Sequence, residues 1–234
     1  MTDGENEKEK VREKDGGPGE LPLRERKKLR TRRALVEAAL ELFSAKGFAA
    51  ATLDELVEAV EVSKRTFFRT FASKEDVALA PERELWRAYA DDIAERRPVD
   101  GQPLLALFER SLYAAVAGME EGWERRFLAS RALADATPAL NAHSLRHCAD
   151  VTDEVVGIVG DGLGATSRAN LNPLRVRLLL ELMLSAWRGA LKEWSAGGRQ
   201  DRAALVAHMD AAFTEIPAVL ELAAQTPNPP REQL

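Results

Sequence analysis

The stretch KRTFFRTF, which begins at Lys64, combines basic and aromatic side chains whose preferred surroundings conflict. Phenylalanine favours burial, whereas arginine and lysine favour water or an anion. At about 100° per residue along a helix, Phe67 and Phe71 share one stripe. Arg65 and Arg69 share a stripe that lies roughly opposite. The spacing predicts a short amphipathic helix with an aromatic underside and a basic outer face that is oriented towards an anion.

Two short capped helices must position these side chains. Thr52, with Glu55 three residues later, has the pattern of a capping box at the start of the first. Ser63 is a typical N-cap for the second, which carries the arginines. A longer helix precedes both and is expected to end at Gly47, since glycine tolerates a left-handed backbone. This order has the plan of a helix-turn-helix, whose recognition helix enters the major groove of DNA.

The rest of the chain repeats the helical pattern. A helix capped by Ser73 is expected over residues 74–97, with a bend or break at Pro81. Further helices are predicted near 102–118, 121–135, 138–163, 173–195 and 201–224. No segment alternates apolar and polar residues as a half-buried strand does. The predicted fold class is all-α.

The predicted organisation has a small N-terminal domain and a larger helical body. Its parts are a disordered tail at 1–23, the helix-turn-helix domain at 24–73, a connecting helix at 74–97, the body at 98–224 and a loose tail at 225–234. The net charge is −5, but residues 24–75 hold 12 Lys and Arg against 8 Asp and Glu. A basic unit beside an acidic body suits a DNA-binding protein with a second function, and a chance variation in surface charge is the alternative.

Composition excludes several classes of protein. The single cysteine, Cys148, rules out an internal disulfide and favours a reducing, cytoplasmic location. The charged N-terminus lacks the apolar core of a signal peptide. The longest apolar run, near 178–184, is interrupted by Glu181 and is too short to span a bilayer, so a soluble protein with no membrane partner is expected.

The segment TLDELVEAVEVSKRTFFRTFASKEDVA, residues 52–78, resembles the DNA-binding segment of the TetR family of bacterial transcription regulators. The residues that agree with the family in type and spacing are Thr52, Val62, Ser63, Thr66, Phe68, Phe71, Ser73, Lys74 and Glu75. The preceding ALVEAALELFSAKGFAAAT resembles the family's first helix and its Gly-Phe exit, so the likeness covers about residues 30 to 80. The variant RTFFRTFASKEDV is similar to an actinobacterial branch, some of whose members are thought to sense acyl-CoA-like ligands.

The resemblance implies a set of residues that contact double-stranded DNA. They are Thr52, Ser63, Lys64, Arg65, Thr66, Phe68, Arg69, Thr70 and Lys74. Thr52 and Lys74 are expected at phosphates, while Lys64, Arg65 and Thr66 are expected at base edges. For the charged residues, the alternative is a solvated helix face.

Four departures from the family pattern affect these roles. Phe68 and Thr70 replace the usual Tyr and His, which removes or alters a phosphate contact at each. Glu61 occupies a turn position that is usually Gly, at a cost of about 1 kcal/mol if the backbone is left-handed there. Arg65 replaces another common Gly and adds charge. Upstream, the basic run Arg24–Arg33 either follows the DNA or only solubilises the lead-in.

For the body, the resemblance implies an effector cavity and a dimer interface. The helices at 173–195 and 201–224 are expected to pack against their copies as a four-helix bundle, which gives a homodimer on a near-palindromic operator. An unknown small-molecule effector is expected to release the dimer from the operator. The candidate cavity residues, each with a core position as its alternative, are Trp86, Phe108, Trp123, Phe127, Arg131, His147 and Trp187.

Catalysis, metal binding and cofactor binding are not expected. His143 and His147 have a spacing that allows a shared metal, but no third ligand has supporting spacing. No phosphate-binding glycine loop or nucleophile elbow occurs. The predicted function is a ligand-released homodimeric repressor of TetR type. The rivals are a helical small-molecule-binding or adaptor protein that has lost DNA reading, and an architectural DNA-binding protein without an effector.

Overall fold

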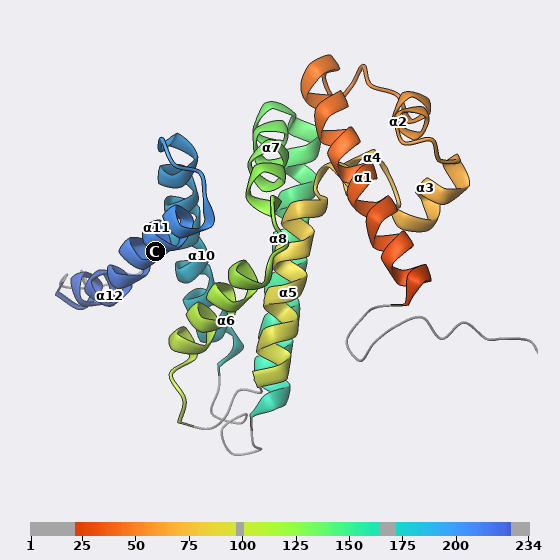
Figure 1. Cartoon of the computed structure of the whole chain (residues 1–234). Helices are drawn as coiled ribbons and strands as arrows, with labels where there is room; N and C mark the ends of the chain where they lie inside the picture. The colour runs from red at the N-terminus through yellow and green to blue at the C-terminus, as the bar shows by residue number, and fades with distance from the viewer. Residues whose placement is uncertain (1–21, 97–100, 164–171, 226–234) are drawn as a thin grey trace, which may run out of the picture.

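The computed structural model describes residues 22–96, 101–163 and 172–225, and within these ranges every regular element is a helix. The helices, labelled in Figure 1, are α1 (Leu23–Lys46), α2 (Leu53–Ala59), α3 (Lys64–Thr70), α4 (Lys74–Ala78), α5 (Ala80–Arg96), α6 (Leu104–Gly118), α7 (Trp123–Ala136), α8 (Pro138–Gly162), α10 (Pro173–Ala196), α11 (Arg202–Thr214) and α12 (Ile216–Gln225). The all-α prediction is confirmed. The predicted tails fall outside the described residues, apart from the few that border α1 and α12.

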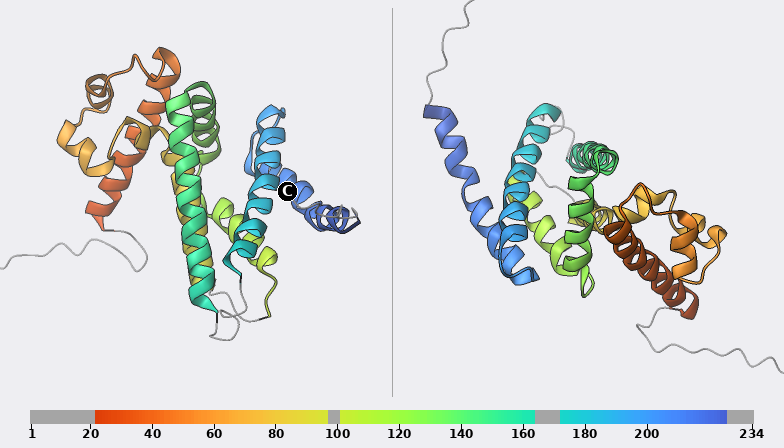
Figure 2. Two further views of the ribbon diagram at one scale, coloured as in Figure 1. Left: turned by 180° about the vertical axis from the view of Figure 1, so that it is seen from behind. Right: turned by 90° about the horizontal axis from the view of Figure 1, so that it is seen from above.

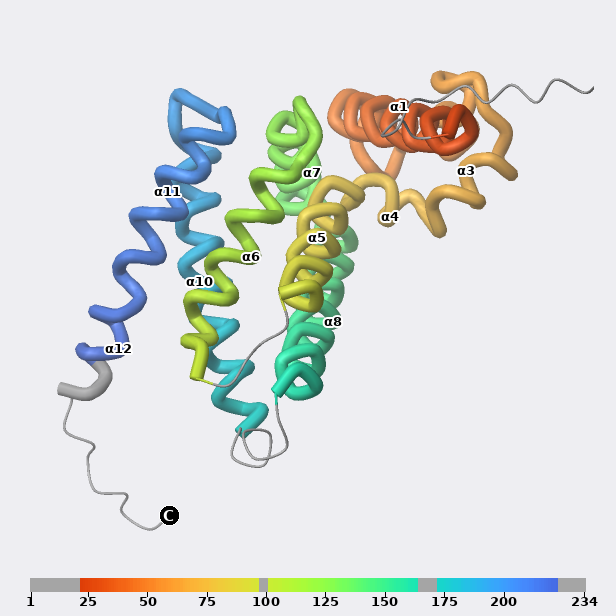
Figure 3. Tube along the Cα trace, turned by 60° about the horizontal axis from the view of Figure 1, so that its bottom comes forward, coloured from red at the N-terminus to blue at the C-terminus, as the bar shows by residue number. Residues whose placement is uncertain are grey.

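Two hydrophobic cores organise the chain. The first is enclosed by α1–α4, where Leu35, Leu56 and Phe67 are fully buried. Leu133 from α7 and Leu140 from α8 join this core, so the N-terminal helices pack directly on the body. The second core lies among α5, α6, α7, α8, α10 and α11. In Figure 1 and Figure 3, α1–α4 lie at one end of the molecule and α11–α12 at the other.

The connection between the two cores is broken rather than continuous. The single helix expected over 74–97 is two helices, because α4 ends at Ala78 and α5 begins at Ala80. The predicted break is confirmed, and it falls at Leu79, two residues before Pro81. Pro81 stands in the first turn of α5, where its missing N–H breaks no helical hydrogen bond.

Local capping explains the short helices of the N-terminal module. The Thr52 hydroxyl accepts from the Glu55 amide, and the Glu55 carboxylate accepts from the Thr52 amide, so the predicted capping box is confirmed. Ser63 and Ser73 cap α3 and α4 through the amides three residues on. Between α2 and α3, Glu61 has φ of 55°, the left-handed conformation that its replacement of glycine made a concern.

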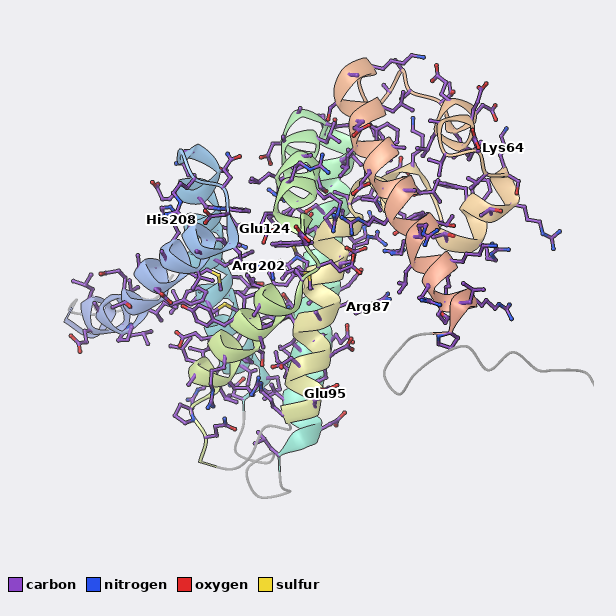
Figure 4. The ribbon with its side chains drawn as sticks, in the orientation of Figure 1. Lys64, Arg87, Glu95, Glu124, Arg202 and His208 are labelled. Atoms are coloured by element: carbon purple, nitrogen blue, oxygen red, sulfur yellow. The ribbon has the colours of Figure 1, made fainter. Side chains whose placement is uncertain are left out.

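The last helices form the edge of the body that is farthest from α3 (Figure 2). Arg202 fastens the start of α11 to the α6–α7 turn: its guanidinium donates to Glu124 at 2.6 Å and to the Ala117 and Met119 carbonyls at 2.9 and 2.8 Å. Figure 4 shows Arg202 and Glu124 side by side.

The stretch Arg202–Leu222 is long and apolar enough to meet the criterion for a membrane span, and 22% of it is buried. No uninterrupted apolar run marks this stretch in the sequence; alanines and scattered leucines make it apolar on average. The α11–α12 break at Glu215 divides it.

Candidate DNA-binding surface and ligand cavity

Helix α3, the predicted recognition helix, separates its aromatic and basic side chains as its spacing predicts. Phe67 is fully buried and Phe71 is 2% exposed, and their rings lie 5.8 Å apart in the core of the N-terminal module. Arg65 and Arg69 are exposed. The aromatic residues therefore fix the roll of α3 about its axis, and this roll turns the two guanidinium groups outward.

Phe68 and Lys64 extend this outer surface along the flank of α3. The Phe68 ring is 57% exposed and meets Phe67 edge to face at 5.3 Å. The Lys64 ammonium lies 2.6 Å from the Asp54 carboxylate of α2, and both side chains are more than half exposed. Figure 4 shows Lys64 on the side of the module that faces away from the body. An exposed ion pair of this kind contributes little, so Lys64 can exchange its partner for DNA.

The hydroxyl groups of the predicted contact set are already engaged within the module. Ser63 Oγ accepts from the Thr66 amide at 3.1 Å and lies 3.1 Å from Thr66 Oγ1. Thr70 donates to the Thr66 carbonyl at 3.0 Å. Thr52 Oγ1 donates to Glu55 at 3.0 Å. Thr52 and Ser63 thus serve as helix caps, and the hydroxyl groups of Thr66 and Thr70 bond within their own module.

Glu55 is held as a carboxylate by the same network. The Lys46 ammonium at the end of α1 forms a short ion pair with Glu55, whose other oxygen accepts from the Thr52 amide and hydroxyl. The pair with Lys46, followed by the Thr52 bonds, lowers the pKa of Glu55 to about 2. The start of α2 is therefore tied to the end of α1.

Lys74 points inward. Its ammonium donates to the Phe48 and Ala51 carbonyls at 2.8 and 2.6 Å and lies 4.6 Å from the centre of the Phe48 ring. These contacts anchor the start of α4 to the loop after α1. The family resemblance placed this ammonium at a phosphate, and its contacts in the structure are those of an internal anchor.

The basic run that begins at Arg24 forms the first turns of α1. Its last two members contact the protein itself: Arg32 pairs with Glu84 of α5 at 3.3 Å, and Arg33 pairs with Glu37 at 3.2 Å. Burial raises the pKa of Glu84, although Arg32 partly opposes this shift. The Arg32–Glu84 pair attaches α1 to the body, and Arg33 adds a hydrogen bond to the Glu121 carbonyl at 3.4 Å, whereas the Arg33–Glu37 pair lies within α1.

A cavity of about 430 Å³ opens in the body between α5, α7, α8 and α10. Four of the seven predicted ligand residues line it, namely Trp86, Phe127, Arg131 and Trp187. The Trp86 and Trp187 rings meet edge to face at 6.2 Å, and Phe127 lies 6.4 Å from Trp187. The volume falls within the range of about 300–1,000 Å³ that is usual for small-molecule sites.

The cavity wall contains a buried carboxylate that the sequence analysis missed. Glu82 is 5% exposed, and its carboxylate accepts from the Ser144 hydroxyl at 2.9 Å and from Arg131 at 3.3 Å. Arg131 also donates to Asp135 at 3.1 Å. A signal was present, since Glu82 stands four residues before Trp86 and therefore on the same face of α5. The partners on α7 and α8 depend on tertiary packing.

Three predicted ligand residues lie away from the cavity. Phe108 is fully buried in the body core, and Trp123 donates to the Pro81 carbonyl at 3.0 Å while lining a separate pocket beside α1. His147 is on α8, where burial and nearby Arg83 lower its pKa. Helical spacing identifies the inward face of a helix but does not say whether that face meets a cavity or another side chain. In the described ranges, no cluster of three or more His, Cys, Asp or Glu side chains could hold a metal ion.

Comparison with known proteins identifies the family. The profile described as "Bacterial regulatory proteins, tetR family" matches residues 35–80. The chain is 33% identical over 220 residues to the HTH-type transcriptional regulator TcmR of Streptomyces glaucescens, covering 92% of this chain and 94% of TcmR. It belongs to the TetR family of transcriptional regulators.

Solved structures of TetR-type regulators align with it at lower similarity. A TetR-family regulator from Mesorhizobium loti MAFF303099 is 18% identical, with a TM-score of 0.48 over 82% of this chain and 97% of the other. A regulator of the TerR/AcrR family from Aquifex aeolicus VF5 is 16% identical, with a TM-score of 0.49 over 82% and 99%.

Membership confirms the helix-turn-helix interpretation of the recognition segment. The chain is a TetR-type, helix-turn-helix transcriptional regulator from a non-enzymatic family of operator-binding repressors. The matched region, 35–80, spans the second half of α1 and all of α2, α3 and α4, so it contains the whole outer surface formed by Lys64, Arg65, Phe68 and Arg69.

Proposed function

We propose that this regulator is a homodimeric repressor that reads a near-palindromic operator with α3 and is released by an effector bound in the cavity. The observation that carries the proposal is the roll of α3. Phe67 and Phe71 hold one side in the core, while Arg65 and Arg69 are exposed on the other. Figure 1 shows α3 at the outer edge of the molecule, away from the body. A recognition helix in this position has access to the major groove.

Each side of α3 has a separate role in this proposal. Arg65 and Arg69 donate to base edges or phosphates, Lys64 adds a charge at the flank, and Phe68 offers an apolar surface to a sugar or a thymine methyl group. The hydroxyl groups of Thr52, Ser63, Thr66 and Thr70 act mainly by fixing α2 and α3, which aligns the groups that contact DNA. Lys74 supports them from within.

The proposed dimer interface lies at the opposite edge of the molecule. Exposed leucines and a valine gather there on α10 and α12: Leu174, Leu178, Val219, Leu220 and Leu222. Large apolar side chains that remain exposed together mark an interaction surface. Other predicted interface residues, including Leu205 and Met209 of α11, are buried in the core of their own chain and support the interface from behind.

The proposed effector response depends on α5. This helix contributes Glu82 and Trp86 to the cavity, and the neighbouring Arg83 holds Asp76 of α4 at 2.6 Å. Asp76 also accepts from the Ala72 amide, just after α3, at 2.9 Å. An effector that favours a different position of α5 changes the distance between the two recognition helices of a dimer, and this lowers the affinity for the operator.

Operator binding at several salt concentrations tests the role of α3. Genomic fragments retained by the purified protein supply the duplex. The double variant Arg65→Ala with Arg69→Ala is expected to weaken binding at least about tenfold and to reduce the slope of log K against log salt by about 1 for each phosphate that the variant no longer neutralises. A matched control, Arg87→Ala with Arg110→Ala, removes the same charge from α5 and α6.

The result also separates the rival functions. An unchanged salt slope in the α3 double variant, or equal losses in the control, would favour a protein that no longer reads DNA through α3. An architectural protein without an effector predicts a solid body, and the cavity of about 430 Å³ speaks against it. The cytoplasm is the proposed location, as for a regulator that acts on chromosomal operators.

A further inference from the structure

The cavity contains polar groups that its own side chains leave unpaired. Trp86 is 4% exposed and Tyr89 is 1% exposed, and both stand on the same face of α5. Neither Trp86 Nε1 nor Tyr89 Oη has a hydrogen-bond partner among the described residues. A buried donor without a partner costs about 1–3 kcal/mol, so two neighbouring ones need an explanation.

The two residues that carry these donors line the same small space. Trp86 and Tyr89, with Cys148, Thr152, Leu180 and others, line a void of about 10 Å³. This void shares Trp86, Cys148 and Leu184 with the main cavity. The two spaces therefore adjoin, and the void, called the inner void below, is large enough for about one oxygen atom.

The apolar wall of the main cavity combines aromatic side chains with leucines such as Leu128, Leu184 and Leu191. Trp86, Phe127 and Trp187 supply three ring systems from α5, α7 and α10. Leu145, which is 64% exposed, adds an apolar side chain from α8. Flat walls of this kind favour a planar, ring-containing body through stacked or edge-to-face contacts.

The charged side chains that line the cavity include more cations than anions. Arg131 is already paired with Glu82 and Asp135. Arg188 and Lys192 stand four residues apart on α10, line the cavity, and form no ion pair within the part of the chain that the structure describes. Two exposed cations on one wall favour an anionic group on the ligand.

We infer that the effector is a planar aromatic acid that carries an oxygen acceptor at the end opposite its anionic group. The acceptor enters the inner void and receives hydrogen bonds from Trp86 Nε1 and Tyr89 Oη. The ring system lies against Trp86, Phe127 and Trp187, and the anionic group pairs with Arg188 and Lys192. This inference rests on the proposed function, because it assigns a chemical class to the effector proposed there.

A pair of probes tests the acceptor. Anthraquinone-2-sulfonate has ring carbonyl oxygens, whereas anthracene-2-sulfonate has the same rings and charge without them. Calorimetric titration of the full-length protein should show about fivefold or greater preference for the quinone. Tyr89→Phe, which removes only a hydroxyl, and Trp86→Phe, which removes the indole N–H, should each reduce this preference about two- to fivefold. Equal affinity of the unaltered protein for the two probes would overturn the role of the inner donors.

The charge and the ring preference are tested with the same protein. Arg188→Gln with Lys192→Gln should weaken anthraquinone-2-sulfonate binding about tenfold, while the matched Arg87→Gln with Arg110→Gln should leave it within about twofold. Laurate, an anion without rings, should bind at least about tenfold more weakly than the quinone. Tighter binding of laurate would replace the aromatic class with an acyl chain and overturn the inference.

Failure of this inference and failure of the proposed function give different results. The titrations use the protein without DNA, so they report on the cavity alone. If the quinone binds as expected but does not release a retained DNA fragment, the class of ligand stands and the effector-release mechanism is wrong. If neither sulfonate binds at millimolar concentration, the ligand class is wrong, while the α3 variants still decide whether the protein reads DNA.

Discussion

Glu61, in the turn between α2 and α3, has a backbone conformation that lowers the stability of the folded protein. Glu61 adopts φ of 55°, and it is the only residue other than glycine with positive φ in the described ranges. A side chain in this conformation costs about 1–2 kcal/mol. Glycine removes this cost but recovers only a part of it in stability, because a chain with glycine loses more conformational freedom on folding. We therefore expect Glu61→Gly to raise the free energy of unfolding by about 0.5–1 kcal/mol in urea titrations.

Glu61→Ala serves as the control for this prediction. It removes the carboxylate but retains the Cβ atom that makes the left-handed conformation unfavourable. Its free energy of unfolding should stay near that of the unaltered protein. An equal gain in both variants would assign the effect to charge rather than to backbone strain.

The capping box at Thr52 gives a second prediction, which concerns pH. The pKa of Glu55 is about 2 in the folded protein, against an ordinary value of 4.5, so its contribution is fully present above about pH 5 and is lost as the pH falls towards 2. Carbon-detected NMR titration of the Glu55 carboxyl should show this low midpoint. Lys46→Ala removes the largest cause and should move the midpoint upward, whereas a midpoint that stays near 2 would contradict the assignment.

How far the sequence predicts individual contacts depends on whether both partners are local. The caps at Thr52, Ser63 and Ser73 and the buried stripe of α3 follow from spacings of three and four residues, and all are confirmed. The inward anchor at Lys74 joins atoms 23 and 26 residues apart, and the Glu82–Ser144 bond joins residues 62 apart. Such pairs depend on how helices pack, which one sequence does not specify.

Among the helices, α4 and α5 connect the two cores along the chain. The Arg83–Asp76 pair is partly buried, and Asp76 also accepts from the amide that follows α3. Removing one partner leaves the other partly desolvated and unpaired. We expect Arg83→Met, which keeps most of the side-chain volume, to lower the free energy of unfolding by about 1–2 kcal/mol and to weaken operator binding.

Arg87→Met is the matched control, since Arg87 lies one turn further along α5 and is exposed (Figure 4). It should leave the urea midpoint unchanged and the operator affinity within about twofold of that of the unaltered protein. Equal effects of both substitutions on DNA binding would assign them to the general charge of α5 rather than to its connection with α4.

The boundaries of these helices were largely predictable, and the exceptions have physical reasons. Body helices were placed to within two residues, because glycines, prolines and the apolar period mark their ends. The break expected at Pro81 falls at Leu79, and the break at Glu215 was not predicted, since the apolar pattern continues across both positions. When a helix axis changes direction but the same face still points inward, the spacing of apolar residues in the sequence does not change.

At the scale of the whole molecule, the chain places its two proposed interfaces at opposite ends. Helix α3 lies at one end and α12 at the other (Figure 3). Apolar side chains are exposed on α10 and α12, and the cavity is lined by α5, α7, α8 and α10. A dimer joined at α10–α12 can present two recognition helices on one side of a duplex, about 34 Å apart. In the proposed dimer, a second copy would cover the exposed side of Arg202–Leu222, the stretch that is apolar enough to meet a membrane-span criterion.

The oligomeric state in solution tests whether a second copy covers these apolar side chains. Leu178 and Leu220 are 59% and 50% exposed, so a charge at either position costs a monomer little but is costly inside an apolar interface. We expect Leu178→Arg with Leu220→Arg to convert a dimer into a folded monomer in analytical ultracentrifugation, and to weaken operator binding at least about 100-fold. Leu145→Arg, at the 64% exposed leucine of α8, should remain dimeric. A double variant that stays dimeric would place the interface elsewhere on the body.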